Sequence, residues 1–146
     1  VNIVCMRIAA LLLSAVALVQ GVRVVDSETP ASPQFKIDVK SFGQKGTQSC
    51  KNGDTATVHY TGKLSDGKVF DSSLNKVAPE PFKFIIGQQD VIQCWDAGLS
   101  QMQVGEKANL TCPPNMAYGQ QGAGDVIPPN ATLLFEIEVL NCEETM

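Results

Sequence analysis

The sequence is poor in the residues that hold metal ions and activate nucleophiles. It contains a single histidine, His59, and none of its 5 cysteines stands in a Cys-x-x-Cys spacing. Because structural zinc sites use paired cysteines and histidines at short intervals, we expect neither a metal nor a cofactor. A hydrolase is excluded for a related reason, since no histidine or second carboxylate is placed to assist Asp71 or a cysteine as nucleophile.

Basic residues are also few and dispersed. The chain has 11 Lys and Arg against 15 Asp and Glu, which gives a net charge of -4. Proteins that bind nucleic acid concentrate positive charge in a patch or stripe, and none is present in this sequence. We therefore expect no nucleic-acid partner.

Long apolar runs are absent except near the N-terminus. The run from Ile8 to Val19 follows Met6-Arg7 and precedes Gln20-Gly21, the order of a secretory signal peptide. It is shorter than the roughly 20 residues of a transmembrane helix, so we expect no membrane span in the mature form. A buried helix is the alternative interpretation of this run.

These signals divide the chain into three parts. We expect residues 1–21 to be a signal peptide, with residues 1–5 as upstream sequence before a start at Met6. Residues 22–34 should form a flexible lead-in and residues 35–146 a single domain. The expected location is the secretory pathway, either the endoplasmic reticulum lumen or the outside of the cell.

Short alternating segments dominate the rest of the sequence. They predict strands at Phe35 to Ser41, Thr55 to Leu64, Val69 to Asp71, Phe82 to Ile85, Lys107 to Cys112 and Thr132 to Asn141. Helical spacing occurs once, in the apolar residues Ile92, Trp95, Leu99 and Met102. Asp90 is placed to cap this helix, and Gly105 follows its end. Many strands and one amphipathic helix predict an α+β fold, with the helix on the concave face of an antiparallel sheet.

The most informative segment is Val58-His59-Tyr60-Thr61-Gly62, followed by the pair Asp66-Gly67 and by Phe70-Asp71-Ser72-Ser73. Asp-Gly is a strong hairpin signal, and the hairpin would return Phe70 beside Tyr60. Asp71 would then be the one polar group of an apolar cup. A single carboxylate among aromatic rings favours recognition or conformational catalysis over hydrolysis.

Removal of the leader would change the cysteine count. Cys5 would be lost, and the even number that remains in an exported chain indicates two disulfides among Cys50, Cys94, Cys112 and Cys142. Four thiols allow three pairings. Strand alternation groups Cys112 with Leu110 and turns Cys142 outward, so these two cysteines should not pair. Two arrangements stay open.

Two acceptor sequons for N-glycosylation are present, Asn109-Leu110-Thr111 and Asn130-Ala131-Thr132. Asn109 lies on the outward side of its predicted strand and Asn130 follows a Pro-Pro turn, so both should be accessible. Sequons also arise by chance, and occupancy therefore stays open.

Further motifs follow one another in a fixed order between Gly53 and Asn141. Beside the two segments already described, they are Pro81-Phe82-Lys83-Phe84, Gly87, Val91-Ile92 with Trp95, Val104-Gly105-Glu106-Lys107, Ala117-Tyr118-Gly119, and Ile127-Pro128-Pro129-Asn130-Ala131-Thr132-Leu133 with Phe135. In order and spacing they resemble the FKBP-type peptidyl-prolyl isomerases, the receptors of tacrolimus and rapamycin. The resemblance implies a half-barrel sheet around a short helix, isomerase activity, and proline-containing segments of folding proteins as partners. We expect a monomer.

The resemblance also implies roles for individual residues. Trp95 would form the floor under the proline ring, with walls from Tyr60, Phe82, Val91, Ile92 and Phe135. Phe70 and Tyr118 would bracket the carbonyl side, where the Ile92 N–H and the Tyr118 hydroxyl pair with the ligand's carbonyl groups. Asp71 would be held by Tyr60. Val126 and Ile127 would close the rim.

The family arrangement favours one disulfide pairing, Cys50 with Cys142 and Cys94 with Cys112. Cys94 stands before Trp95, where the family usually has glycine, so the second disulfide would tie down the pocket floor. The loop from Leu74 to Glu80 offers Lys76 and no arginine behind Asp71, so the charge partner of this carboxylate stays open. A proline-peptide or macrolide-binding chaperone module with little isomerase activity is the alternative function.

Overall fold

The computed structural model describes residues 33–44 and 47–145 of the chain. The expected signal peptide at 1–21 and nearly all of the expected lead-in at 22–34 lie outside the described residues. The expected domain is described except for residues 45–46 and Met146.

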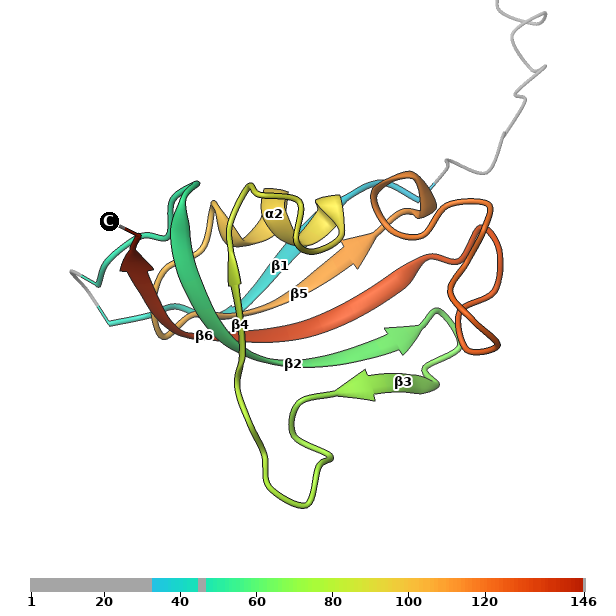
Figure 1. The fold of residues 1–146 in the computed structure, drawn as a ribbon, viewed down its shortest axis with the longest axis horizontal. Helices are drawn as coiled ribbons and strands as arrows, with labels where there is room; N and C mark the ends of the chain where they lie inside the picture. Colours follow the sequence, from blue (N-terminus) through green and yellow to red (C-terminus); the bar gives the residue numbers. More distant parts are fainter. Residues whose placement is uncertain (1–32, 45–46, 146) are drawn as a thin grey trace, which may run out of the picture. The chain divides into compact units, whose positions relative to one another are not determined.

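The described residues form six strands, one α-helix and one short 3₁₀-helix (Figure 1). In chain order they are β1 (Lys36–Ser41), β2 (Asp54–Leu64), β3 (Val69–Ser72), β4 (Phe82–Ile85), α2 (Gln93–Leu99), β5 (Lys107–Cys112), η1 (Pro114–Met116) and β6 (Leu133–Glu144). The expected strands and the expected helix are all present, and the α+β prediction is confirmed.

The strands form a single antiparallel sheet. Its order is β1-β5-β6-β2-β3, and β4 also pairs with β2. The two longest strands, β2 and β6, pair along their full length, and both curve past α2 in Figure 1. Alternate side chains of the sheet, such as Leu110, Phe135 and Val139, are buried in the core. This is the half-barrel around a short helix that the resemblance implied.

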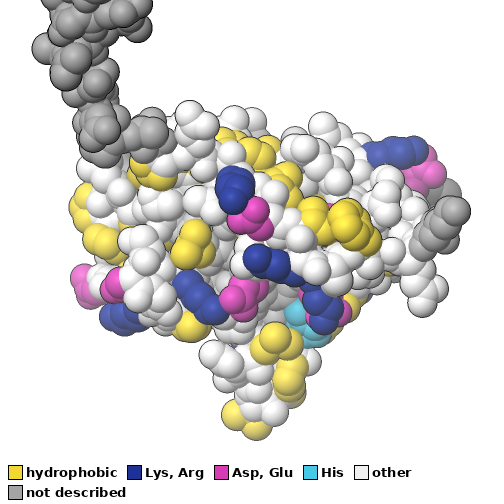
Figure 2. Space-filling model, turned by 180° about the vertical axis from the view of Figure 1, so that it is seen from behind, with side chains coloured by type: hydrophobic (Ala, Val, Ile, Leu, Met, Phe, Trp, Pro, Cys, Tyr) yellow, Lys and Arg dark blue, Asp and Glu magenta, His cyan; other side chains and the backbone are white. Residues whose placement is uncertain are grey.

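Charged side chains of both signs are interspersed on the face of the molecule seen from behind (Figure 2). Two ion pairs of this mixed kind join neighbouring strands of the sheet, Lys63 with Glu136 and Lys107 with Glu138. Exposed pairs of this type contribute at most about 1 kcal/mol each to stability. Positive and negative side chains are therefore mixed on this face, and neither sign forms a patch of its own there.

The helix is shorter than its apolar spacing predicted. α2 begins after Ile92, whose side chain forms no cap, and ends before Ser100, so the prediction of Asp90 as the cap is wrong. Met102 is buried beyond the helix, in a turn where its N–H donates to the Leu99 carbonyl. A turn can place a residue on the same apolar face as a helix, so spacing alone overstates the length. No helix among the described residues is long and apolar enough to cross a bilayer.

The side chain of Cys142 is buried, whereas strand alternation predicted that it would point outward. The register of β2 and β6 shifts between the pairs Thr57 with Asn141 and Val58 with Val139, so Leu140 has no partner. This β-bulge adds one residue to β6 and reverses the alternation beyond it.

Two disulfides join the described cysteines. Cys50 pairs with Cys142, with Cα atoms 5.5 Å apart, and Cys94 pairs with Cys112, with Cα atoms 5.6 Å apart. This is the pairing that the resemblance implied. Cys112 and Cys142 do not meet because they lie toward opposite ends of β6, where Cys112 faces Leu133 and Cys142 faces Ala56. The second disulfide fastens α2 to β5.

Candidate active site

A cavity of about 270 Å³ opens among aromatic side chains from several elements. It is lined by Tyr60, Phe70, Asp71, Phe82, Asp90, Val91, Ile92, Trp95, Tyr118 and Phe135. The lining includes the six residues that we expect to be catalytic from the resemblance, Tyr60, Phe70, Asp71, Trp95, Tyr118 and Phe135. Of the aromatic residues in this lining, Phe82 and Tyr118 are exposed, with 40% and 42% of their surface accessible, so the cavity is open to solvent at these two rings.

Trp95 lies at the bottom of this cavity. It is 4% exposed, and its ring stands nearly perpendicular to those of Tyr60 at 5.0 Å and Phe135 at 5.2 Å between centroids. Such edge-to-face pairs each contribute about 0.5–1.5 kcal/mol beyond the burial of their area. Phe84 packs behind the indole at 5.7 Å and is itself buried. The floor is therefore held rigidly before any ligand arrives.

Gly62 makes room for two of the rings. A Cβ atom at this position would lie 2.5 Å from Cζ of Phe70 and 2.9 Å from Cε1 of Phe135. The two rings stand at 90° with their centroids 5.7 Å apart. Any side chain at position 62 would push one of these rings into the cavity or into the core.

A Gly62→Ala variant should therefore lose activity as well as stability. We expect overpacking to lower the free energy of unfolding by about 1–3 kcal/mol, and the displaced rings to lower kcat/KM. Gly53→Ala is the matched control, because Gly53 has a φ of 96° and no atom within 4 Å of the added carbon. It should lose stability alone. Isomerase assays and urea unfolding of both variants separate the two effects, and equal kcat/KM in both would contradict this role of Gly62.

Asp71 and Asp90 are the two carboxylates that line the cavity, and Tyr60 donates to Asp71. The phenol oxygen lies 2.6 Å from Oδ2 of Asp71, and the Ser72 N–H donates to Oδ1 at 2.8 Å. Both oxygens of the carboxylate are thus engaged. No ion pair to Asp71 forms within the described part of the chain, and Lys76 is not its partner.

The phenol of Tyr60 remains a donor over the physiological pH range. Burial, the hydrogen bond to Asp71 and the negative charge of Asp71 raise its pKa well above the ordinary value. Loss of the phenol proton would place two negative charges side by side. The hydrogen bond from Tyr60 therefore holds the Asp71 carboxylate in place within the cavity.

The raised pKa of Tyr60 predicts a loss of stability at alkaline pH. Above about pH 10 the unfolded chain releases this phenol proton while the folded protein keeps it, so the free energy of unfolding falls as pH rises. A Tyr60→Phe variant should lack this component. Urea unfolding at pH 8 and pH 10.5 provides the measurement, and an equally steep fall in the variant would show that Tyr60 is not its source.

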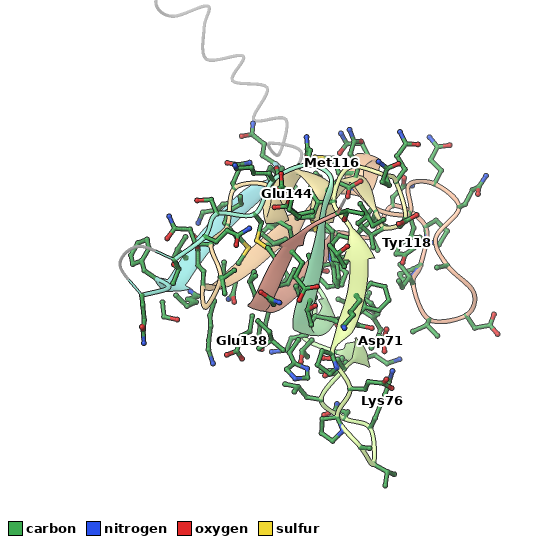
Figure 3. The ribbon with its side chains drawn as sticks, turned by 60° about the vertical axis from the view of Figure 1, so that its left-hand side comes forward. Asp71, Lys76, Met116, Tyr118, Glu138 and Glu144 are labelled. Carbon is green, nitrogen blue, oxygen red and sulfur yellow. A yellow bond between two sulfur atoms is a disulfide. The ribbon has the colours of Figure 1, made fainter. Side chains whose placement is uncertain are left out.

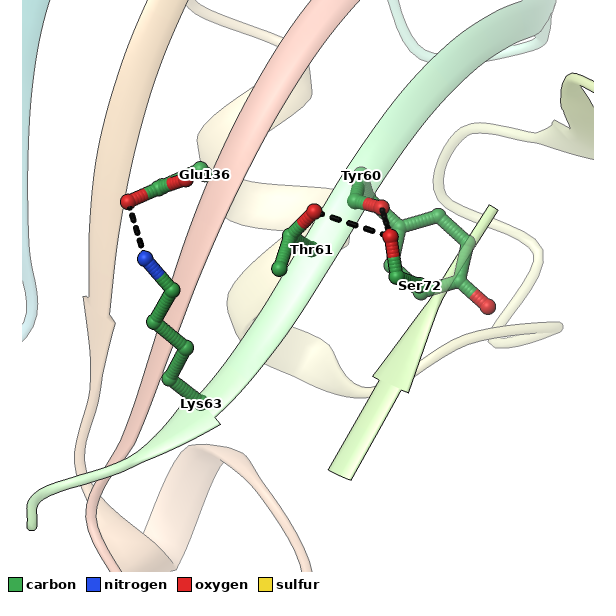
Figure 4. A network of polar contacts seen from close by, with 5 residues as sticks. All are labelled: Tyr60, Thr61, Lys63, Ser72 and Glu136. Carbon is green, nitrogen blue, oxygen red and sulfur yellow. Dashed lines mark hydrogen bonds and ion pairs between the residues drawn. The ribbon is translucent and has the colours of Figure 1, made fainter. Parts of the chain in front are cut away.

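The backbone of Tyr60 is held by the two serines that follow Asp71. Its carbonyl oxygen accepts from the Ser73 N–H at 3.0 Å and from the Ser72 hydroxyl at 3.1 Å, which also bonds to Thr61 (Figure 4). The Ser73 hydroxyl accepts from the Tyr60 N–H at 3.0 Å and contacts Nδ1 of His59 at 3.0 Å. Both serines are buried. They orient Tyr60, a role that the sequence signalled only by two adjacent hydroxyls after the motif carboxylate.

Two residues expected at the rim do not line this cavity. Ile127 is 6% exposed and belongs to the hydrophobic core, while Val126 is 48% exposed. The N–H and the carbonyl of Ile127 both form hydrogen bonds with Ala123, and this tight loop turns the Ile127 side chain into the core. Asp90, which was expected to cap the helix, lies at the cavity instead. Phe82, Val91 and Ile92 line it as expected.

A larger cavity, of about 620 Å³, shares Val91 with the aromatic cavity. It contains no aromatic ring and is lined by Asn52, Gly87, Gln89, Val91, Gln93, Asp96, Ala97 and Ser100. Ligand sites are mostly apolar with a few polar groups. The smaller aromatic cavity fits that description better.

Comparison with known proteins agrees with this geometry. A family model described as FKBP-type peptidyl-prolyl cis-trans isomerase matches residues 46–140. FK506-binding protein 2 of Yarrowia lipolytica is 46% identical over 137 residues, which cover 94% of this chain and 93% of that protein. Peptidyl-prolyl cis-trans isomerase FKBP1A of Xenopus laevis is 53% identical over 93 residues, 64% of this chain and 84% of that protein. Peptidyl-prolyl cis-trans isomerase Fkbp12 of Drosophila melanogaster is 51% identical over 98 residues, 67% of this chain and 89% of that protein. The chain belongs to the family of FKBP-type peptidyl-prolyl cis-trans isomerases.

Proposed function

We propose that this protein accelerates rotation about X-Pro peptide bonds by binding the twisted amide in the aromatic cavity. The observation that carries the proposal is a rigid aromatic floor, Trp95, beside the carboxylate of Asp71, which the neutral phenol of Tyr60 already engages. No bond is broken in this reaction. Amide resonance alone opposes rotation, with a barrier of about 18–20 kcal/mol.

An apolar cavity lowers this barrier because the amide changes polarity as it turns. The planar amide has separated charge, and the twisted amide has lost it. A site with little water therefore disfavours the ground state more than the transition state. An acceleration of about four decades requires about 5–6 kcal/mol of such discrimination.

The cavity supplies these contributions from different sides. Trp95 supports the proline ring, with Tyr60 and Phe135 packed against its edge. Among the described residues, none accepts a hydrogen bond from the N–H of Ile92, so this donor at the cavity is free for a substrate carbonyl. Tyr118 offers a second, exposed donor. Asp71, fixed by Tyr60, presents negative charge toward the rotating amide.

A protease-coupled isomerisation assay on a proline tetrapeptide tests the proposal. The oxidised protein should convert the cis peptide orders of magnitude faster than the spontaneous process, which takes tens to hundreds of seconds. If the peptide binds and the rate stays spontaneous, the protein is a binding module and the proposed catalysis is wrong.

We also propose that the protein works on folding chains in the secretory pathway. Two buried disulfides support an oxidising compartment. The match to the Yarrowia lipolytica relative covers 137 residues, more than the domain from residue 35 onward, so it reaches into the proposed leader. Expression with a reporter tag and N-terminal sequencing of the mature chain would locate the cleavage. Retention of residues 1–21 in a cytosolic product would contradict this location.

Macrolide binding is a further part of the proposal. One relative is named FK506-binding protein 2. Apart from Val126 and Ile127, every residue that the resemblance assigned to ligand contact lines the aromatic cavity. Tacrolimus or rapamycin should inhibit isomerisation by occupying that cavity. The sequence contains 1 tryptophan, Trp95, so quenching of tryptophan fluorescence reports binding in this cavity.

The two sequons are proposed as glycosylation sites. Asn130 is exposed, and its N–H donates to the carbonyl of Gly119, next to Tyr118. Asn109 is half-buried on β5 between Asp38 and Glu136. A glycan at Asn130 would stand close to the mouth of the aromatic cavity. Intact-mass measurement before and after endoglycosidase treatment, with Asn109→Gln and Asn130→Gln variants, counts the occupied sites.

A further inference from the structure

A second cavity adjoins the aromatic one. It has a volume of about 510 Å³ and is lined by Tyr60, Ser73, Lys76, Glu80, Pro81, Phe82 and Lys83. Tyr60 and Phe82 line both cavities, so their rings, with centroids 6.0 Å apart, form the wall between them. The outer side of the second cavity is the loop between β3 and β4. This loop projects from the sheet in Figure 1, and Figure 3 labels Lys76 on it.

The side chains that line the second cavity carry a net positive charge. The cavity holds two lysines and one glutamate, whereas the chain as a whole carries a net charge of -4. The ion pairs of the described residues involve neither Lys76 nor Lys83 nor Glu80. Both ammonium groups are exposed and therefore available to an acidic ligand.

The spacing of the two cavities identifies the part of a substrate that reaches the second one. An extended peptide advances at most about 3.3–3.6 Å per residue. The ring centroids of Trp95 and Phe82 are 6.1 Å apart, so with the proline on Trp95 an extended chain needs at least about two residues to pass the wall of Tyr60 and Phe82. A side chain two or three positions from the proline then lies over Lys76 and Lys83.

We propose that this second cavity is a substrate subsite that selects proline segments with an acidic residue two or three positions from the proline. The inference rests on the proposed isomerase function and specifies its substrates. Lys76 and Lys83 are the specificity-determining residues, and neither takes part in rotation of the amide. An exposed ion pair shifts an equilibrium by about two- to fivefold, so two lysines should favour glutamate over glutamine by about three- to tenfold.

Exchange NMR of cis and trans peptides tests the subsite without a protease, whose own charge preference would interfere. Peptides carry Glu, Gln or Lys in turn at the second and third positions on either side of a central proline. At low salt, kcat/KM for one of the Glu peptides should exceed that for its Gln counterpart by about three- to tenfold, with the Lys counterpart slower than Gln. In about 1 M salt, where screening acts within about 3 Å, the preference should disappear.

Charge variants assign the preference to the two lysines. Lys76→Gln with Lys83→Gln should bring the ratio of Glu to Gln to about one, and Lys76→Glu with Lys83→Glu should invert it. Lys68→Gln is the matched control, because Lys68 is an exposed lysine outside both cavities. It should keep the wild-type ratio.

The outcomes separate this inference from the proposed function. A ratio near one at every position, or a preference that survives the double Gln variant, would overturn the subsite while the enzyme remains an isomerase. Absence of acceleration with every peptide, Gln peptides included, would overturn the proposed function and the subsite with it.

Discussion

An Asp71→Val variant should lose about ten- to a hundredfold in kcat/KM and retain its fold. A hydrogen bond to a charged group contributes about 1.5–3 kcal/mol, and here the bond from Tyr60 at 2.6 Å fixes the carboxylate within the cavity. Valine fills a similar volume but cannot accept that bond, so the phenol loses its partner. The peptide assay gives the activity, and circular dichroism confirms the fold.

A double-mutant cycle with Tyr60→Phe shows whether Asp71 and Tyr60 act as a unit. Tyr60→Phe removes the donor and keeps the ring against Trp95. Because each single change breaks the same hydrogen bond, the double variant should be little worse than Asp71→Val alone. Fully additive losses would mean that the two groups act independently, and unchanged turnover in Asp71→Val would refute the site.

Removal of the Cys50–Cys142 disulfide should cost more stability than any other change considered. The two residues are 92 positions apart, and the chain-entropy relation for a loop of that length gives about 4–5 kcal/mol. Cys94 and Cys112 are 18 positions apart, which gives about 3 kcal/mol. Small domains are stable by only about 5–15 kcal/mol in total, so loss of either bond should be evident.

Paired alanine variants measure both contributions, because all four cysteines are buried and alanine avoids placing a hydroxyl in the core. Urea unfolding should give a lower midpoint for the variant without Cys50 and Cys142 than for the variant without Cys94 and Cys112. Only the latter should also lose activity beyond its loss of stability, because Cys94 adjoins Trp95 at the pocket floor. Midpoints equal to that of the wild type would contradict a structural role for the bonds.

Much of the fold was predictable because side chains alternate between buried and more exposed along β5 and along β6 up to Val139. Leu110 and Cys112, which strand alternation placed on one side of their strand, are both buried. Failures occurred where a local irregularity interrupts a period. The bulge at Leu140 places Cys142 on the opposite side of β6 from the predicted one. The turn after Ser100 places Met102 at helical spacing although α2 has already ended. Neither irregularity has a residue type that reveals it.

The site residues that belong to a family motif could be predicted from the sequence. The residues whose position depends on tertiary contacts could not. The rings around Trp95 follow from the family motifs, and the structure brings them to one cavity. The hydrogen bond between the Ser73 hydroxyl and the Tyr60 N–H forms only because the hairpin brings these two residues together. The burial of Ile127 depends on its bonds to Ala123, which the sequence does not express.

Selective binding of a twisted amide is the central claim, and the fluorescence of Trp95 tests it directly. Two prolyl ligands are compared, one with a planar amide and one in which a perpendicular α-dicarbonyl group takes its place. Transition-state analogues bind at least about a hundredfold more tightly than substrates, and we expect that margin for the perpendicular ligand. Equal dissociation constants for the two ligands would contradict the account.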